Sequence, residues 1–435
     1  MKKIELEKLD VVVNYEKLDN GLEIYLVPLS NKNKYYMTYA TRYGSTVNSF
    51  IPCNSKKEEN VPFGIAHFLE HKMFEMEDGV DPFTFFSESG TDANAATGFD
   101  FTKYICSGTK NFDSNLRYLI NYVNKPYFTD SNVEKEKGII AEEINMYKDE
   151  AVFAIENSIR MNTYFEDLHR YDIAGEVSDI EKITKEDLYL CYDNFYSPRN
   201  MFVLVVGNFD LDNALSIIKE ECCKLENKYD DMPKIKKVNE PSCIREKYEV
   251  VPFNISVPKL MMTIKLKRDL FNIDNELKLD LYLNLIVNIL FGYSSVFRED
   301  ALDNNLMTDF YYDVESVDGY RTVYLYAETT YPNELLEKIN NELSNMNITN
   351  DDLERYKKVW IANEIKMVDS VDSITENLFD DIIRYKNVIA DKVSIYRSLN
   401  MKELKNVISK FNIENKAVVC YVPKGMKDFK INEAW

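Results

Sequence analysis

The chain has 435 residues, of which 45% are hydrophobic and 13% aromatic, and it carries a formal net charge of −20 at pH 7. This length exceeds what one hydrophobic core usually organises, so we expect two or more domains, and the composition excludes an intrinsically disordered protein. The negative charge argues against nucleic acids and anionic membrane surfaces as partners, because their phosphates would be repelled.

The amino-terminal residues hold no apolar core of about 7–15 residues with a cleavage site after it, and no uninterrupted apolar span of about 18 residues occurs in the chain. The seven cysteines are scattered and form no C-x-x-C pair, which argues against a disulfide framework or a cysteine zinc site. We therefore expect a cytoplasmic protein that does not span a membrane.

The first half of the chain predicts alternating strands and helices. Two strands flank the turn signal Asp19-Asn20-Gly21, and residues 34–45 alternate as a half-buried strand. An apolar helical pattern begins at Val61. The elements expected after it are a strand at 99–108, a helix at 111–126, a long acidic amphipathic helix at 130–165, and a helix leading into an apolar strand within 182–209.

This order of elements recurs in the second half at an offset of about 220 residues. Three pairs of segments resemble each other: 129–146 and 349–367, 185–207 and 401–423, and 101–123 and 321–343. The repeat predicts an α+β fold of two structurally similar halves, each a mixed sheet packed with helices.

We expect the halves to be residues 1–227 and 253–435, joined by a charged, proline-containing linker at 228–252. The second half contains no histidine. The first half is therefore expected to be catalytic and the second to be a noncatalytic half that encloses the substrate.

The stretch GIAHFLEHKMFE, residues 64–75, contains two of the three histidines of the chain. On a helix, His67, Glu70 and His71 project from one face, so the two imidazoles can bind one Zn²⁺ while the glutamate reaches a metal-bound water. This H-x-x-E-H order inverts the H-E-x-x-H motif. The alternative, a solvated helix face, is less favoured because the flanking apolar residues make the helix half buried.

A catalytic zinc site needs a third protein ligand. The candidates are His169, the remaining histidine, and the carboxylates of the acidic helix, which are Glu134, Glu136, Glu142, Glu143 and Glu150. Glu136 and Glu143 are seven apart and so share a helix face, which would let one bind the metal while the other orients a ligand. The spacing alone does not choose among these residues.

These segments resemble the insulinase or pitrilysin family of zinc metallopeptidases. Residues 67–71 match its inverted motif, and residues 134–147 match a downstream segment in which two glutamates lie seven apart. The resemblance covers essentially the whole chain and implies the two-halved fold of the insulinase-like peptidases. It implies Zn²⁺ as cofactor, with metal ligands His67, His71 and Glu143, general base Glu70, and Glu136 as a supporting carboxylate of the catalytic site.

Residues 90–97, GTDANAAT, resemble the substrate strand of the family, an edge strand that pairs with the peptide backbone. This implies Asn94, Ala95 and Thr97 as substrate-binding residues, to which we add Phe74, just after the motif. For Asn94 the alternative is an ordinary residue of a turn or strand end. His169 lies in a segment that resembles a family loop and is expected to be structural.

The second half departs from the family in one respect. Many active members carry an arginine and a tyrosine seven residues apart that contact the substrate, and residues 294–315 lack this spacing. Arg298, Tyr311 and Tyr312 lie in that region but do not align with those roles. Either another pair substitutes or a partner chain supplies the contacts.

The chain resembles short members of the family, such as mitochondrial processing peptidase and its bacterial relatives, in which two homologous chains close around a chamber. This implies a homodimer, or a heterodimer with a homologous and catalytically silent chain. If acidic residues line such a chamber, the net charge favours a basic peptide; otherwise it only solvates the surface.

The expected function is hydrolysis of peptides or unfolded segments by a zinc-dependent endopeptidase, with processing of a precursor or leader peptide as one form of it. One alternative is a noncatalytic or partner-dependent subunit that captures peptides. A second is a zinc hydrolase of other substrates, which a strand built for backbone pairing argues against.

Overall fold

The computed structural model describes residues 1–426 and 428–432. The chain forms two compact units, each built from three stretches of sequence. Unit 1 comprises residues 1–144, 172–237 and 364–392, and unit 2 comprises residues 145–171, 238–363 and the chain from residue 393 onward.

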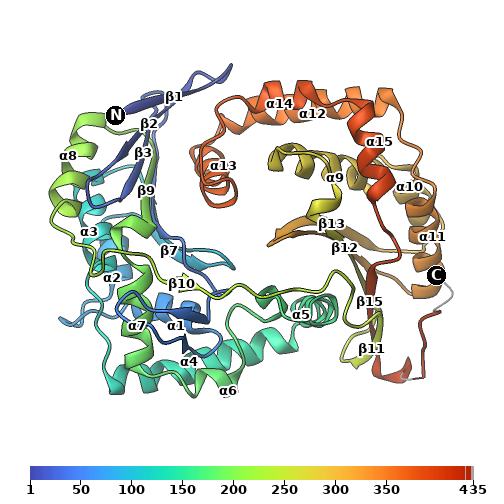
Figure 1. Cartoon of the computed structure of the whole chain (residues 1–435), viewed down its shortest axis with the longest axis horizontal. Helices are drawn as coiled ribbons and strands as arrows, with labels where there is room; N and C mark the ends of the chain where they lie inside the picture. Colours follow the sequence, from blue (N-terminus) through green and yellow to red (C-terminus); the bar gives the residue numbers. More distant parts are fainter. Residues whose placement is uncertain (427, 433–435) are drawn as a thin grey trace. The chain divides into compact units, whose positions relative to one another are not determined.

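Unit 1 contains a seven-stranded sheet with the order β1-β2-β3-β9-β4-β8-β7 (Figure 1). Strands β3 and β9 pair in parallel, and the other neighbours are antiparallel. The strands are β1 Lys2–Leu6, β2 Val11–Lys17, β3 Glu23–Pro28, β4 Tyr35–Thr41, β7 Asp92–Thr97, β8 Thr102–Gly108 and β9 Met201–Gly207. The strand that resembles the family's substrate strand, β7, is therefore an edge strand with one unpaired side.

Helices cover both faces of this sheet. One face packs against a large core to which α1, α3, α4, α7 and α8 contribute, and the other packs against α13. The helices are α1 Ile65–Lys72, α2 Pro82–Glu88, α3 Phe112–Val123, α4 Asp130–Asp149, α6 Val177–Ile180, α7 Lys185–Phe195, α8 Leu211–Cys222 and α13 Val371–Arg384. A small sheet has the order β10-β5-β6, with β5 Ser49–Ile51, β6 Glu59–Asn60 and β10 Lys234–Ile235.

Two expectations for this half are wrong in detail. Strand β4 is buried at every residue, not half buried, because Met37 and Tyr39 face one core while Tyr36 and Ala40 face the other. The long helix expected over 130–165 is two helices, because Glu150 adopts an extended backbone conformation between α4 and α5.

Unit 2 contains a five-stranded sheet with the order β11-β15-β12-β14-β13 (Figure 1). Here β11 and β15 pair in parallel, and the remaining neighbours are antiparallel. The strands are β11 Tyr248–Phe253, β12 Lys259–Lys267, β13 Asp309–Val317, β14 Tyr320–Glu328 and β15 Lys416–Pro423. The helices that belong to it wholly or in large part are α5 Ala151–Thr163, α9 Glu276–Phe291, α10 Val296–Asp303, α11 Pro332–Ser344, α12 Asn350–Met367, α14 Lys392–Ser398 and α15 Met401–Lys410.

The two sheets confirm the internal repeat. The order β3-β9-β4-β8-β7 in unit 1 has the same pattern of chain order and strand direction as β11-β15-β12-β14-β13 in unit 2. Helices α4 and α12 also begin alike: the backbone N–H of Asn132 donates to the hydroxyl of Thr129, and that of Asp352 donates to the hydroxyl of Thr349. The fold is thus α+β with two similar halves.

The compact units differ from the sequence division at residues 228–252 because each sheet is covered by a helix from the other half of the sequence. In unit 1, Ile374 and Leu378 of α13 pack on the sheet. In unit 2, Ile155 and Ile159 of α5 pack on the sheet. An apolar sheet face is stable only when another element packs on it. In each unit, the helix that packs on this face comes from the other repeat of the sequence.

One helical stretch, Glu276–Asp303, has the length and composition of a membrane-spanning helix, and 61% of its most apolar window is buried within the structure. Its first part, α9, supplies Leu279, Leu283, Ile286 and Leu290 to the core of unit 2. Burial among other helices and strands accounts for its apolar composition.

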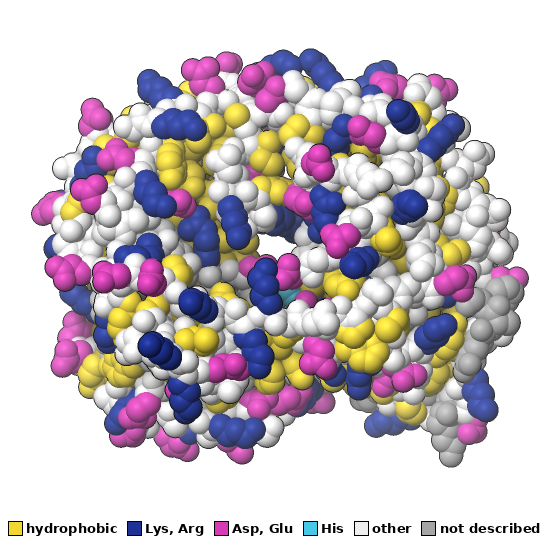
Figure 2. All heavy atoms as spheres, viewed as in Figure 1, with side chains coloured by type: hydrophobic (Ala, Val, Ile, Leu, Met, Phe, Trp, Pro, Cys, Tyr) yellow, Lys and Arg dark blue, Asp and Glu magenta, His cyan; other side chains and the backbone are white. Residues whose placement is uncertain are grey.

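Lysine and arginine side chains are interspersed with aspartate and glutamate side chains on the face of the molecule in Figure 2. On that face the acidic residues do not gather into one patch, as is usual for a solvated surface.

Candidate metal centre

Helix α1, which carries the H-x-x-E-H motif, begins at a glycine that no other residue can replace without strain. Gly64 adopts φ +81, and a Cβ atom on it would lie 2.2 Å from the carbonyl oxygen of Ala174. Because the loop at Ala174 lies so close, the start of α1 is fixed against residues that are far away in the sequence.

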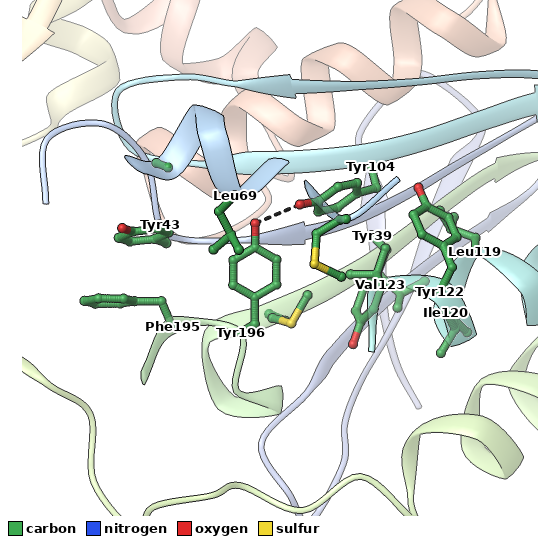
Figure 3. Packing of buried hydrophobic residues seen from close by; sticks show 14 of the residues in the cluster. Tyr39, Tyr43, Leu69, Tyr104, Leu119, Ile120, Tyr122, Val123, Phe195 and Tyr196 are labelled. Atoms are coloured by element: carbon green, nitrogen blue, oxygen red, sulfur yellow. Dashed lines mark hydrogen bonds between the residues drawn. The ribbon is translucent and has the colours of Figure 1, made fainter. Parts of the chain in front are cut away.

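The apolar face of α1 anchors it in an aromatic core. Phe68 and Leu69 are fully buried, and Figure 3 shows Leu69 beside Tyr104 and Tyr196, whose hydroxyls are hydrogen-bonded at 2.8 Å. With these side chains inside, the motif's polar residues project from the other side of the helix.

Helix α4 supplies the carboxylates that face α1. Its buried residues Val133, Ile140 and Ile144 pack in the core of unit 1 and so fix the rotation of the helix. Glu136 and Glu143, seven residues apart, both point at the histidines.

His67, His71 and Glu143 come together as a candidate metal cluster, with one ligand atom of each within 4.8 Å of the others. His67 Nε2 lies 3.8 Å from Glu143 Oε1, and His71 Nε2 lies 3.6 Å from Glu143 Oε2. In a tetrahedral zinc site with bonds of about 2.0–2.1 Å, neighbouring donor atoms are about 3.3 Å apart. The two separations from Glu143 are a few tenths of an ångström longer than this spacing, and Zn²⁺ fits the three residues if their side chains draw together.

The protonation state of His67 also suits a cation. Burial lowers the pKa of His67 to about 3, aided by the charge of His71, so the His67 imidazole is neutral at physiological pH. Its Nδ1 is buried and has no hydrogen-bond partner in the described part of the chain. The nitrogen that remains to bind a ligand is Nε2, the one that faces Glu143.

Glu136 contacts His71 and is not part of the cluster. His71 Nδ1 lies 3.1 Å from Glu136 Oε1, so a proton on Nδ1 leaves Nε2 free to bind a metal. Burial acts to lower the pKa of His71, but the hydrogen bond to Glu136 and the nearby carboxylates outweigh it and raise that pKa. Burial likewise acts to raise the pKa of Glu136, and its contacts with His71 and Lys72 outweigh it and lower that pKa.

Glu70 lies beside the cluster on the same face of α1. It is 8% exposed, and its Oε2 accepts a hydrogen bond of 2.7 Å from the hydroxyl of Thr97 on β7. Burial raises the pKa of Glu70, opposed in part by this hydrogen bond. A buried carboxylate with a raised pKa is suited to take up and release a proton.

The expected substrate-binding residues lie on or near the edge strand β7. Asn94 is exposed and its side chain accepts a hydrogen bond from the backbone N–H of Ala95, while Ala95 packs against the core. Thr97 turns toward Glu70, a contact that the sequence did not reveal. Phe74 stacks on Phe83 with ring centroids 4.4 Å apart.

The other candidates for a third ligand are placed elsewhere. His169 is buried in unit 2 and hydrogen-bonds to Asp167 at 2.6 Å, which accords with a structural role. Glu134 pairs with Lys137, and Glu142 and Glu150 are exposed.

In unit 2, the guanidinium of Arg298 donates to the carbonyl of Phe310 and stacks on Tyr293. Tyr311 and Tyr312 line a pocket of about 370 Å³ together with residues of α5, β12 and β14. Arg298 is not among the residues that line it, so these side chains do not form an arginine–tyrosine pair in one pocket.

Two family models match the chain. The model of the insulinase family, peptidase family M16, matches residues 38–174, a range that contains every residue of the candidate site. The model of the M16 peptidase inactive domain matches residues 182–359.

The chain also resembles individual proteins over its whole length. It is 37% identical over 431 residues to a Bacillus subtilis protein named as the uncharacterised zinc protease YmfH, and the match covers 98% of this chain and 100% of that relative. Among solved structures, an M16-like peptidase from Alicyclobacillus acidocaldarius has 29% identity and a TM-score of 0.89, covering 96% of this chain and 100% of that one. A protease from Helicobacter pylori has 20% identity and a TM-score of 0.80, covering 94% and 99%, and shares the fold.

Proposed function

The chain belongs to the insulinase family of peptidases, family M16, and on that premise we propose that it is an active zinc-dependent endopeptidase. The observation that carries the proposal is the meeting of His67, His71 and Glu143 within 4.8 Å, with Glu70 on the same face of α1. Relatives named as zinc proteases support the choice of metal.

His67, His71 and Glu143 would hold the metal, and the proposed mechanism assigns the proton transfers to Glu70. Zinc held there would supply Lewis acidity that makes a water molecule easier to deprotonate. Glu70 takes the proton of the attacking water and returns it to the amine that leaves when the peptide bond breaks. Glu136 keeps the ring of His71 in place through its hydrogen bond to Nδ1.

Strand β7 is the proposed docking site for the substrate. Its open edge can pair with an extended peptide through backbone hydrogen bonds, with Asn94 and Ala95 on the strand and Phe74 nearby. Backbone pairing recognises no particular sequence, so we propose peptides and unfolded segments as substrates, including precursor or leader peptides.

We further propose that the chain works in the cytoplasm, either as a homodimer or as a heterodimer with a homologous, catalytically silent chain. The missing arginine–tyrosine spacing in residues 294–315 supports a partner that supplies contacts to the substrate.

The test is the substitution Glu70→Gln, which keeps the size of the side chain and removes the base. We expect zinc content to be retained and turnover of a quenched-fluorescence peptide to fall by a factor of about 10² to 10⁴. The matched control is Glu142→Gln on the exposed side of α4, which should cleave at the wild-type rate. Wild-type cleavage by Glu70→Gln would refute the assignment.

The second candidate function is that of an inactive subunit that captures peptides. It is favoured by the absence of the arginine–tyrosine spacing from residues 294–315. The two candidates separate when zinc content and peptide turnover are measured for the chain alone and after mixing with its co-purified partner. An active peptidase cleaves in at least one of these states, and a capturing subunit binds zinc or peptide without turnover in both.

A further inference from the structure

We infer that Lys72, the residue after the motif, is a positioning residue that holds Glu136 against His71 and thereby strengthens zinc binding. The inference rests on the proposed zinc site and adds a residue to it.

Lys72 is the last residue of α1, and its side chain is fully buried. A buried ammonium group is costly unless carboxylates compensate its charge. Lys72 has two: Glu75, one turn further along the chain, and Glu136 on α4. The charge of this buried lysine is therefore compensated by Glu75 and Glu136.

The two carboxylate oxygens of Glu136 contact two different side chains. Its Oε1 lies 3.1 Å from His71 Nδ1, and its Oε2 lies 3.6 Å from Lys72 Nζ. Since each oxygen faces a different group, the two contacts together fix the rotation of the carboxylate.

The arrangement of charges points the same way. Glu75 can balance the charge of Lys72, which leaves the charge of Glu136 for His71. Without the ammonium group, Oε2 of the buried Glu136 would lose its charged partner, and the carboxylate could turn away from His71. His71 would then lose the contact that keeps Nε2 directed at the metal position.

A simpler role is also open to Lys72, because its ion pair with Glu75 could serve only to stabilise the end of α1. The two roles differ in what couples to zinc. If Lys72 acts by positioning Glu136, substituting Lys72 should not change zinc affinity in a protein whose Glu136 is already replaced. If Lys72 only stabilises the helix, the substitution should have the same effect with and without Glu136.

The experiment measures zinc affinity by competition with a chromogenic chelator, for the wild type, Lys72→Met, Glu136→Gln and the double variant. We expect Lys72→Met to weaken zinc binding by about tenfold, in the range seen when residues that support a metal ligand are changed. In the Glu136→Gln background the same substitution should have almost no further effect. Lys72→Arg should restore most of the affinity, because it keeps the charge.

The matched control is Lys137→Met. Lys137 lies on α4 next to Glu136, but it contacts Glu134 and the carbonyl of Glu181 instead. Its substitution removes the same charge nearby and should leave zinc affinity unchanged.

Equal zinc affinity of Lys72→Met and the wild type would overturn the inference, as would a tenfold loss in both backgrounds. If Lys72→Met does not fold, crystals of the wild type with and without a chelator decide. Glu136 must then keep both contacts without zinc, and a carboxylate that swings away from His71 and Lys72 would contradict the inference. A wild-type protein that binds no zinc would refute the proposed function itself, which is a different result.

Discussion

Helices α1 and α9 occupy equivalent places in the two repeats, since α1 lies between β4 and β7 in the chain and α9 lies between β12 and β13, yet only α1 carries histidines. Helix α1 buries Phe68 and Leu69 and leaves His67, Glu70 and His71 on its other side. Helix α9 is apolar and largely buried, and the second half of the sequence contains no histidine. The same framework therefore holds either the candidate metal cluster or additional core.

The partner helices α4 and α12 extend the comparison. In the sequence repeat, Tyr356 of α12 corresponds to Glu136 of α4. The side chain of Glu136 reaches α1, and that of Tyr356 reaches α9. Glu136 contacts His71 on α1, while the hydroxyl of Tyr356 donates to the carbonyl of Asn288 on α9 at 2.8 Å. The same contact between helices thus lies at the candidate metal cluster in unit 1 and joins two helices of the core in unit 2.

The largest expected effect comes from His67→Ala, which removes a metal ligand from the polar face of α1. With two of three protein ligands left, zinc affinity should fall by more than the 10–100-fold typical of residues that only support a ligand. Peptide cleavage should be lost with it. The zinc content of the variant is measured after gel filtration. A variant that retains its zinc would show that His67 does not distinguish α1 from α9 as a metal-binding helix.

Thr97→Val should have the next largest effect, since it removes the hydroxyl that donates to Glu70. A hydrogen bond to a charged group contributes about 1.5 kcal/mol or more, so kcat should fall by about tenfold while zinc content stays the same. Thr97→Ser keeps the hydroxyl and should remain close to the wild type. Equal rates for the valine and serine variants would show that this contact does not position the base.

Tyr356→Phe is expected to have the smallest effect. It tests the contact between α12 and α9 in unit 2. Loss of its hydrogen bond to Asn288 should lower the free energy of unfolding by about 1 kcal/mol without changing zinc affinity. Glu136→Gln, at the equivalent position, should instead weaken zinc binding by about 10–100-fold. Chemical denaturation and chelator competition on both variants provide the measurements, and a zinc effect of Tyr356→Phe would contradict the division of roles.

Much of the fold follows from the sequence because the repeat is visible in it. Paired residues such as Leu188 and Leu404 are both fully buried, as expected from matching helices. The clustering of His67, His71 and Glu143 also agrees with the motif and its downstream segment, because buried residues on α1 and α4 set which faces of the helices meet.

Other features depend on contacts that no local pattern encodes. The exchange of α5 and α13 between the repeats is decided by which apolar face each helix covers, far away in the sequence. Strand β4 was expected to be half buried because Thr38 alternates with Met37 and Tyr39, but α3 packs on one face of the strand and α13 on the other. The contacts of Thr97 with Glu70 and of Lys72 with Glu136 join segments that are far apart in the sequence, although a lysine beside the apolar residues of 64–75 is itself a local signal of a buried charge.

Anomalous diffraction at the zinc absorption edge would show whether one half of the duplicated framework holds a zinc ion, as we propose. Crystals of the wild-type protein grown with zinc should show a strong peak about 2.0–2.2 Å from ligand atoms of His67, His71 and Glu143. No comparable peak should occur between α9 and α12. A zinc ion bound elsewhere, or no zinc at these three residues, would show that His67, His71 and Glu143 are not the metal ligands.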